Sequence, residues 1–473
     1  MLSRQVRPFF CKFRVRCASS SGALEFEDIP SPKRLPLIGT TLSLLAAGGA
    51  KNLHKYVDRR HKELGLIFKD NVGPVSCVFL ADPEGMRHVF SKEGKYPVHI
   101  KPESWLLYNE KHGYTRGLFF MDGEEWLKFR RIMNSLLLKG SLSWLEESCD
   151  AAGEVLVKKL EGFKNIEVPN LEQEMYKWSM DVIVSVLVGK RTYASHQEEL
   201  DVLVYELAGK VSKIFETTSK LQLISAKLAQ KYQLGYWKRF ENSVKEGLDS
   251  AYSIVNHITA NYKDADGLMA KMLSENIKSD DLNRIIVDLI LGAGDTTAYT
   301  MIWILYVLSK NPNVQKELRN QLLQNKKPPF LKNVVKETLR LYPVAPFITR
   351  FLPESVTLCN YRIPANTLVV MSIYTSGRNE KYFIEPELFQ PNRWLRNNHE
   401  MNMALQQASL PFGIGSRSCI GRKIAEHQLH GTLAKIVDRF QVEMCNREEV
   451  HDILQMIIKP SQNMRFKFNR IQD

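Results

Sequence analysis

The sequence predicts a mainly α-helical fold with a small β region, and three observations lead to this expectation. Residues 141–280 consist mostly of amphipathic helix patterns with polar joins. An unusually long helix pattern follows over 281–310. Strand-like runs are short and gather at 66–80 and 347–371. With 473 residues, of which 44% are hydrophobic and 25% charged, the chain has the composition of a large globular protein.

The N-terminal residues 1–24 contain five basic side chains and no acidic one. This composition, rich in arginine and serine, is typical of a mitochondrial transit peptide. A disordered basic arm is the alternative. A membrane anchor is not indicated, because the segment has no continuous apolar run of about 20 residues. Pro30, Pro32 and Pro36 then predict a stiff, non-helical entry into the folded part.

The charge and the cysteines limit the possible partners. The net charge is +13, and about +8 remains without the five basic residues of the leader. An acidic protein or a membrane surface fits this excess better than nucleic acid, since no zinc finger, nucleotide-binding loop or basic repeat accompanies it. The seven cysteines are scattered. They argue against a disulfide framework and a structural zinc site, and for a reducing compartment.

The first elements of the folded part lead to a possible anion clamp. We expect a helix over 52–64, strands over 66–68 and 76–80, a helix over 83–89, and a loop with a short helix over 97–120. Asp122 then opens a helix that places Trp126 and Arg130 on one face. An indole N–H beside a guanidinium can hold a carboxylate. An exposed arginine beside a packed tryptophan is the alternative.

Residues 215–240 mix apolar side chains with lysine and arginine at helical spacing. This pattern favours a helix that lies on a membrane face. An ordinary solvated helix with one core face is an equally good interpretation.

The helix over 281–310, with Ser279 or Asp280 as its N-cap, has a weak middle. Two glycines, Asp295 and two threonines interrupt it, and such residues cost up to about 1 kcal/mol each relative to alanine. The weakness predicts a bend that opens the backbone. Asp295 and Thr296 would then hold and relay a proton. The alternative is a tolerated kink. Asp288 and Asp295 argue against a transmembrane helix.

The next segments predict a helix over 331–341 and a small β region. Glu337 and Arg340 stand three residues apart on this helix, and Arg393, in a proline-punctuated meander, can join them. Strands are expected over 347–351, 356–359 and 367–371, and a terminal hairpin over 440–468 that turns at Pro460 and Ser461.

The segment 412–421 reads Phe-Gly-Ile-Gly-Ser-Arg-Ser-Cys-Ile-Gly and precedes a helix over 422–440. Its glycines permit close approach of the backbone to a flat object. A helix N-terminus and the nearby Arg417 favour the thiolate form of Cys419. Such a thiolate suits an axial ligand of haem iron. An ordinary buried cysteine is the alternative. His427 and His430 lack a third ligand, so they do not predict a zinc site.

The pattern Phe-x-x-Gly-x-Arg-x-Cys-x-Gly resembles the haem-binding loop of cytochrome P-450 monooxygenases. The resemblance extends from about residue 30 to the C-terminus. It implies a single domain over 25–473, with larger helical and smaller β subdomains and haem b between them, and O2 as co-substrate. Cys419 would be the iron ligand, and Asp295 and Thr296 would guide protons. Further cofactor-binding residues implied are Trp126, Arg130, Arg350, Phe412, Arg417 and Gly421. Glu337, Arg340 and Arg393 would form a buried structural triad. One departure is Ala293, where the family more often has glycine.

Within the family, the chain resembles the mitochondrial branch. This implies a peripheral enzyme on the matrix side of the inner membrane that receives electrons from a ferredoxin with its NADPH-dependent reductase. The docking residues would be Lys332, Lys336, Arg422 and Lys423.

Segments such as 46–50 and 116–121 further resemble the insect ecdysteroid 2-hydroxylases. They imply hydroxylation of 2-deoxyecdysone at carbon 2, with carbon 22 or 20 as alternatives. Other readings are a haem protein that does not hydroxylate, which would not need Asp295 and Thr296, and an isomerase or dehydratase, which would not need a docking face. We expect an apolar pocket for a steroid, closed partly by the turn at Pro460 and Ser461 and lined by Leu118, Phe119, Leu291, Ala293, Val344, Ala345 and Phe347.

Overall fold

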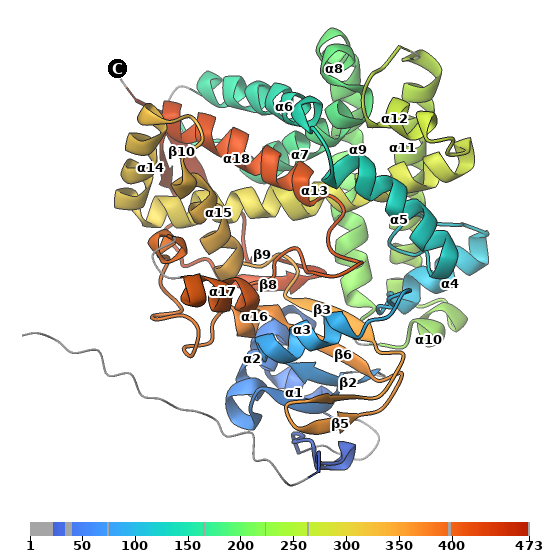
Figure 1. The fold of residues 1–473 in the computed structure, drawn as a ribbon. Coiled ribbons are helices and arrows are strands. Elements are labelled where there is room, and N and C mark those ends of the chain that lie inside the picture. The colour runs from blue at the N-terminus through green and yellow to red at the C-terminus, as the bar shows by residue number, and fades with distance from the viewer. Residues whose placement is uncertain are drawn as a thin grey trace, which may run out of the picture.

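The structure has a larger helical part and a smaller β part, as expected from the sequence (Figure 1). The computed structural model describes residues 22–33, 40–72, 75–163, 166–222, 224–262, 264–395 and 399–471. The expected transit peptide therefore lies almost wholly outside the described residues.

Eighteen α-helices lie within the described chain. They are α1 (Thr41–Ala46), α2 (Leu53–Leu64), α3 (Pro83–Ser91), α4 (Glu103–His112), α5 (Gly123–Leu138), α6 (Ser143–Gly162), α7 (Leu171–Val188), α8 (Lys190–Ser195), α9 (Gln197–Lys220), α10 (Ala226–Lys231), α11 (Gly235–Asn261), α12 (Leu268–Ser274), α13 (Ser279–Lys310), α14 (Pro312–Gln324), α15 (Pro329–Leu341), α16 (Ile373–Ser376), α17 (His399–Ala408) and α18 (Arg422–Arg439).

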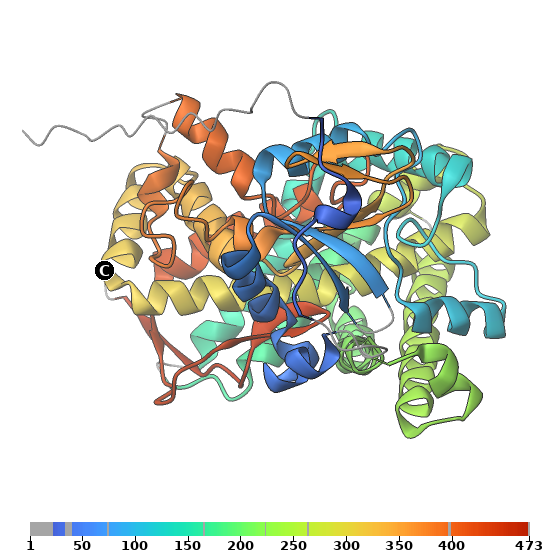
Figure 2. The same ribbon diagram turned by 90° about the horizontal axis from the view of Figure 1, so that it is seen from below.

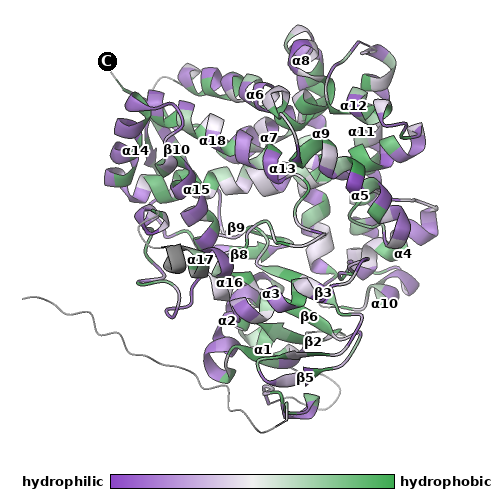
Figure 3. Cartoon of the chain, viewed as in Figure 1, coloured by the Kyte–Doolittle hydropathy of each residue, from purple (hydrophilic) through white to green (hydrophobic). Residues whose placement is uncertain are grey.

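The main sheet has four strands, in the order β1 (Ile67–Val72), β2 (Val75–Leu80), β6 (Leu368–Ser372) and β3 (Phe347–Phe351). Strands β2 and β6 pair in parallel, and the other neighbours are antiparallel. Seen from below, the sheet lies in front of α13 (Figure 2). Strands β2 and β6 are mostly hydrophobic, whereas α14 is mostly hydrophilic (Figure 3).

Three two-stranded pairs complete the β part. They are β4 (Val356–Leu358) with β5 (Tyr361–Ile363), β7 (Phe440–Met444) with β10 (Phe466–Arg470), and β8 (Asp452–Gln455) with β9 (Ile457–Pro460). The predicted turn at Pro460 and Ser461 is wrong. The inner hairpin turns at Met456, which has a positive φ of 65°, and Pro460 pairs with Asp452 at the opposite end.

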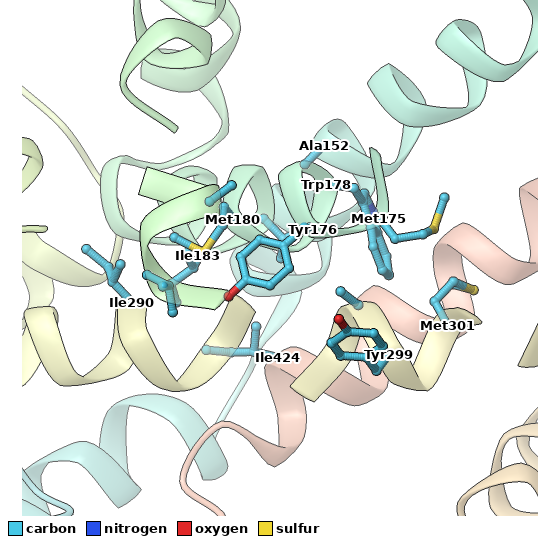
Figure 4. Close-up of a cluster of buried hydrophobic side chains, with 14 of the residues drawn as sticks. Ala152, Met175, Tyr176, Trp178, Met180, Ile183, Ile290, Tyr299, Met301 and Ile424 are labelled. Carbon is cyan, nitrogen blue, oxygen red and sulfur yellow. The ribbon is translucent and has the colours of Figure 1, made fainter. Parts of the chain in front are cut away.

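The long helix α13 is the centre of the hydrophobic core. Figure 4 shows side chains of α7, such as Tyr176 and Met180, gathered against residues of α13. In the described part of the chain, α13 is the one helix long and apolar enough to cross a membrane. Because 72% of its most apolar window is buried inside the fold, it serves as a core helix.

Two local predictions were wrong. The N-cap of α13 is Lys278, which makes no side-chain capping bond, instead of Ser279 or Asp280. Residues 215–240 do not form one helix, since they contain the end of α9, all of α10 and the start of α11. In both helical regions, packing against neighbouring elements outweighed the local sequence preferences.

Candidate functional site

The candidate site is a cavity of about 840 Å³ between α13, the cysteine-containing loop and the sheet. Its walls are mostly apolar side chains from α7, α9, α13, β3, β6 and the β8–β9 hairpin. Cys419, Arg130, Arg350 and Arg417 also reach it. A thiol, three guanidinium groups and a large apolar surface thus share one cavity.

The cysteine-containing loop is held by its backbone. The amide of Cys419 donates to the carbonyl oxygen of Phe412 at 2.9 Å, and α18 begins three residues after the cysteine. Gly413 and Gly415 adopt positive φ values of 63° and 80°, which a residue with a side chain would disfavour. The loop therefore presents a free thiol next to a helix N-terminus.

The Cys419 side chain is exposed, and it lines the cavity. Burial raises its pKa, while the amide of Gly421 and the guanidinium groups of Arg130 and Arg422 act in the opposite direction. A cation bound at the sulfur would favour the thiolate further, since coordinated thiols are deprotonated.

A buried carboxylate fixes the same loop from the other side. Glu93 accepts the amide of Ser416 at 2.7 Å and the Nε of Arg350 at 2.6 Å. A Cβ on Gly415 would lie 2.4 Å from this carboxylate. The sequence analysis missed Glu93, which comes 323 positions before Ser416 and lies in no motif.

The residues predicted to hold carboxylates gather at one side of the cavity. The guanidinium of Arg417 lies 4.3 Å from the Trp126 ring centre and donates to Pro97, Met121 and Asp122. Arg130 donates to the carbonyl oxygen of Ser418. Burial lowers the pKa of Arg417 to about 10.

Unpaired polar atoms remain in and beside this cationic group. The Nε of Arg130 and both ring nitrogens of His99 are buried without hydrogen-bond partners. His99 was missed by the sequence analysis, and no local pattern would have revealed it. Buried polar atoms are normally paired, so the unpaired N–H of Arg130, beside the guanidinium groups of Arg350 and Arg417, indicates an anionic ligand. These groups fit the carboxylates of haem b, with Cys419 available as the iron ligand and the apolar walls available for the ring.

The predicted acid–alcohol pair is divided between two faces of α13. Thr296 lines the cavity, and its hydroxyl donates to the carbonyl oxygen of Gly292 at 3.0 Å. Asp295 is buried behind the helix, next to Tyr176, whose hydroxyl group points toward α13 in Figure 4. Burial raises the pKa of Asp295 to about 7. The structure therefore places Thr296, but not Asp295, in the cavity wall.

Six of the seven predicted pocket residues line the cavity, namely Leu118, Phe119, Ala293, Val344, Ala345 and Phe347. Leu291 does not, because the cavity-facing residues of α13 follow the spacing 285, 288, 289, 292, 293, 296, 297 and 300, and position 291 lies off this face. The analysis missed Ile183, Leu221, Leu454 and Met456, which reach the cavity from α7, the end of α9 and the β8–β9 hairpin.

Glu337, Arg340 and Arg393 meet away from the cavity. Glu337 accepts from Arg340 at 2.8 and 2.9 Å, from Arg393 at 2.8 Å and from the Trp394 indole at 2.9 Å. Arg340 also donates to the carbonyl oxygens of residues 377, 386 and 388. This network joins the segment that contains Arg393 and Trp394 to α15.

A second concave surface, of about 1640 Å³, lies on the outer side of the cysteine-containing loop. We call it the basic groove. It contains the four predicted docking residues, Lys332, Lys336, Arg422 and Lys423. Arg422 and Lys423 both pair with Glu426, at 2.8 and 3.0 Å. Phe412 and Gly413 line both the groove and the cavity.

His427 and His430 also line the basic groove. In the part of the chain that the structure describes, no group of three or more His, Cys, Asp or Glu side chains could hold a metal ion. Burial lowers the pKa of both histidines, to about 4 for His430.

Comparison with known proteins gives consistent matches. The family model described as Cytochrome P450 matches residues 29–468. The chain is 38% identical to "Cytochrome P450 315a1, mitochondrial" of Drosophila melanogaster, over 94% of this chain and 88% of that protein. It is 31% identical to "Cytochrome P450 10" of Lymnaea stagnalis, over 94% and 85%. It is 28% identical to "Cholesterol side-chain cleavage enzyme, mitochondrial" of Oncorhynchus mykiss, over 93% and 90%.

Proposed function

The chain belongs to the cytochrome P450 family of monooxygenases, which use haem b and O2, and from this premise we propose that it hydroxylates 2-deoxyecdysone at carbon 2 to give ecdysone. The observation that carries the proposal is the opening of the Cys419 loop onto a large apolar cavity. Relatives named for cholesterol and for 1,25-dihydroxyvitamin D(3) support a substrate of the sterol class.

Haem b, when bound, supplies the chemistry that transfers one atom of O2 to the substrate and reduces the other to water. Cys419 would bind its iron, and Arg130, Arg350, Arg417, His99 and Trp126 would hold its carboxylates. The walls exclude water and orient the substrate. Thr296 would hold a proton at its Oγ1 on the cavity side, while Asp295, with a pKa of about 7, would exchange protons behind it near neutral pH.

Electrons would come from a mitochondrial ferredoxin, itself reduced by an NADPH-dependent reductase. The basic groove supports this part of the proposal, since acidic ferredoxins can be steered to a concave basic surface. Phe412 and Gly413 separate this surface from the cavity. The path from docked protein to haem would therefore be short.

We place the protein in mitochondria, on the matrix side of the inner membrane, with residues 1–24 as its transit peptide. Its relatives with mitochondrial names support the compartment. Exposed Leu228, Tyr232, Leu234 and Tyr236 form an apolar segment at α10 and the start of α11, with lysines nearby. Apolar groups flanked by lysine suit contact with an anionic membrane surface.

Product identification tests the proposal. Purified protein, ferredoxin, reductase, NADPH and 2-deoxyecdysone should yield a single product hydroxylated at carbon 2, as determined by mass spectrometry and NMR. Hydroxylation only at carbon 22, carbon 20 or another position would refute the assigned regiochemistry. Absence of any hydroxylated product from a range of steroids would refute the substrate class.

A further inference from the structure

A backbone turn over residues 117–121 presents Leu118 and Phe119 to the cavity. The carbonyl oxygen of Gly117 accepts the amides of Phe120 at 3.0 Å and Met121 at 3.1 Å, and these bonds close the turn around the two side chains. Both side chains line the cavity, although Phe119 is 50% exposed. The turn belongs to no helix or strand. Contacts with neighbouring elements must therefore hold it in place.

Asp288 on α13 holds the turn at its beginning. The Nε and Nη2 of Arg116 both donate to Oδ1 of Asp288, the former at 3.0 Å. The backbone amide of Gly117 also donates to this carboxylate. The two side chains of the ion pair are only 3% and 8% exposed. The contacts of Asp288 thus go to the two residues that directly precede Leu118.

The backbone of the turn lies directly against α13. A Cβ on Gly117 would lie 2.6 Å from the carbonyl oxygen of Arg284 and 2.9 Å from Oδ2 of Asp288. Arg284, which stands one helical turn before Asp288, donates to the carbonyl oxygen of Arg116 at 3.4 Å. Two successive turns of α13 therefore contact residues 116 and 117.

Stability alone does not explain an ion pair in this mostly apolar wall. Replacing a buried ion pair by apolar side chains of similar volume is often neutral or stabilising, because both charges have lost their water. What the pair does provide is direction, since two guanidinium nitrogens and one backbone amide meet a single carboxylate. Such a set of contacts permits only a narrow range of positions for the turn.

The other end of the turn is held by the cysteine-containing loop. Arg417 donates to the carbonyl oxygen of Leu118 at 3.4 Å and to that of Met121 at 2.7 Å. The turn therefore connects α13 with the loop of Cys419. Its two central side chains are fixed relative to both of these cavity walls.

We propose that Asp288 and Arg116 are positioning residues, which fix the 117–121 turn so that Leu118 and Phe119 determine which carbon of the substrate is hydroxylated. This inference rests on the proposed function, because it takes the cavity to be the steroid site. Asp288 acts through the turn and not through contact with the substrate. A displacement of about 1 Å can change the rate at a reacting centre about 100-fold. The ratio of products is therefore a sensitive measure of where the turn lies.

The double variant Arg116→Met/Asp288→Leu tests the assignment, since it removes both charges and leaves none buried alone. Amide hydrogen exchange of residues 117–121, measured on the full chain without substrate, should become about tenfold faster. In the haem-loaded protein, the Kd of 2-deoxyecdysone should rise about fivefold or more in a spectral titration. A second positional product should reach about a tenth or more of the total.

A second buried ion pair supplies the matched control. Lys177 and Asp181 pair at 2.7 Å on α7, with side chains 13% and 4% exposed, and neither residue lines the cavity. Lys177→Met/Asp181→Leu should leave the product ratio, the Kd and the exchange of residues 117–121 as in the wild type, whatever its effect on thermal unfolding. A purely structural role of the Arg116–Asp288 pair would make the two double variants alike in all these measurements.

Phe119→Ala tests the turn directly. It removes a half-exposed side chain and leaves the ion pair intact, so it should change the product ratio without faster exchange in the rest of the turn. If Arg116→Met/Asp288→Leu does not fold, Asp288→Asn takes its place. This variant keeps an oxygen for the Gly117 amide and removes only the charge, and it should show the same changes to a smaller degree.

Two results would overturn the assignment. One is wild-type exchange or a wild-type product ratio in the folded Asp288 variant. The other is a wild-type product ratio in Phe119→Ala. These outcomes are separate from the proposed function. A wild type that hydroxylates another carbon refutes only the regiochemistry, because the variants are still compared by product ratio. If no steroid is hydroxylated, the substrate class is refuted, and unchanged exchange in the Asp288 variant would still overturn the positioning role.

Discussion

At the scale of single residues, the site depends on side chains that hold the Cys419 loop in place. Glu93 links Arg350 to the amide of Ser416, and the glycine at 415 leaves room for that carboxylate. Arg130 reaches the carbonyl of Ser418, one residue before the cysteine. These contacts position the thiol through the backbone around it. They therefore leave the sulfur atom available for a ligand.

Replacing Cys419 tests its assigned role as the iron ligand. We expect Cys419→Ala to fold but to lose the carbon monoxide difference band of a thiolate-ligated haem, because the loop over 412–421 contains no second cysteine. Cys77 also lines the cavity, so Cys77→Ala is the matched control and should keep the band. A thiolate band in purified Cys419→Ala would contradict the assignment.

The buried Asp295 should make stability depend on pH. Burial raises its pKa from 3.8 to about 7 in the folded protein. The folded state therefore binds the proton more tightly than the unfolded state, and stability falls as pH rises from about 4 to about 7. Three pKa units correspond to roughly 4 kcal/mol.

Asp295→Asn removes this titration. The variant should gain stability relative to the wild type as pH rises from 5 to 8, by a few kcal/mol. Thermal unfolding of both proteins across this range measures the difference. Asp280→Asn, an exposed change on the same helix, should show no such trend. A pH-independent difference for Asp295→Asn would mean that the carboxyl group titrates normally.

Residues in local motifs were predictable, and residues brought in from distant segments were not. The loop pattern identified Cys419 and Arg417, since glycine, cation and cysteine occur within a few positions. By contrast, Glu93 acts on Arg350 across 257 positions, and Arg116 acts on Asp288 across 172. Such pairings arise from the tertiary fold, so no local sequence pattern predicts them.

At the scale of elements, α13 shows where sequence patterns fail. Its length was predicted, and its middle remains α-helical through both glycines. The two glycines have different surroundings. A Cβ on Gly294 would lie 2.9 Å from the Tyr176 hydroxyl and 3.0 Å from the Met180 sulfur, whereas a Cβ on Gly292 would meet nothing within 4 Å. Gly294 thus permits close packing with α7, and Gly292 leaves space in the cavity.

This difference predicts opposite effects of two matched substitutions. Gly294→Ala should destabilise the protein by about 1–3 kcal/mol through overpacking against α7. Gly292→Ala should stabilise the helix by about 0.5–1 kcal/mol, while its methyl group narrows the cavity and weakens steroid binding. Unfolding measurements and spectral titrations on both variants test these expectations. Equal stabilities would show that α7 can move away from position 294 at little cost.

At the scale of the whole molecule, two concave surfaces lie on opposite sides of one loop. The cavity opens toward α13, and the basic groove lies outside, with Phe412 and Gly413 shared between them. The mainly α fold with a small β region was confirmed, because long periodic segments specify helices well. The arrangement of cavity, loop and groove required the tertiary structure, since their residues come from every third of the chain.

The basic groove gives the prediction for the molecule as a whole. Lys332→Glu combined with Lys336→Glu changes the charge of the groove by four units. This should weaken ferredoxin binding at least about tenfold, and the effect should diminish as salt screens the charges. The readouts are ferredoxin-dependent turnover and its dependence on ionic strength. Hydroxylation driven by peroxide needs no ferredoxin and should remain near the wild-type rate.

A second double variant controls for the total change in charge. Lys213→Glu combined with Lys278→Glu alters two exposed lysines that line neither the groove nor the cavity. It should bind ferredoxin as the wild type does if docking depends on where the charge lies. Equal losses in the two double variants would show that only net charge matters. Loss of peroxide-driven turnover in the groove variant would instead indicate damage to the fold, and the docking assignment would then have no support from this pair.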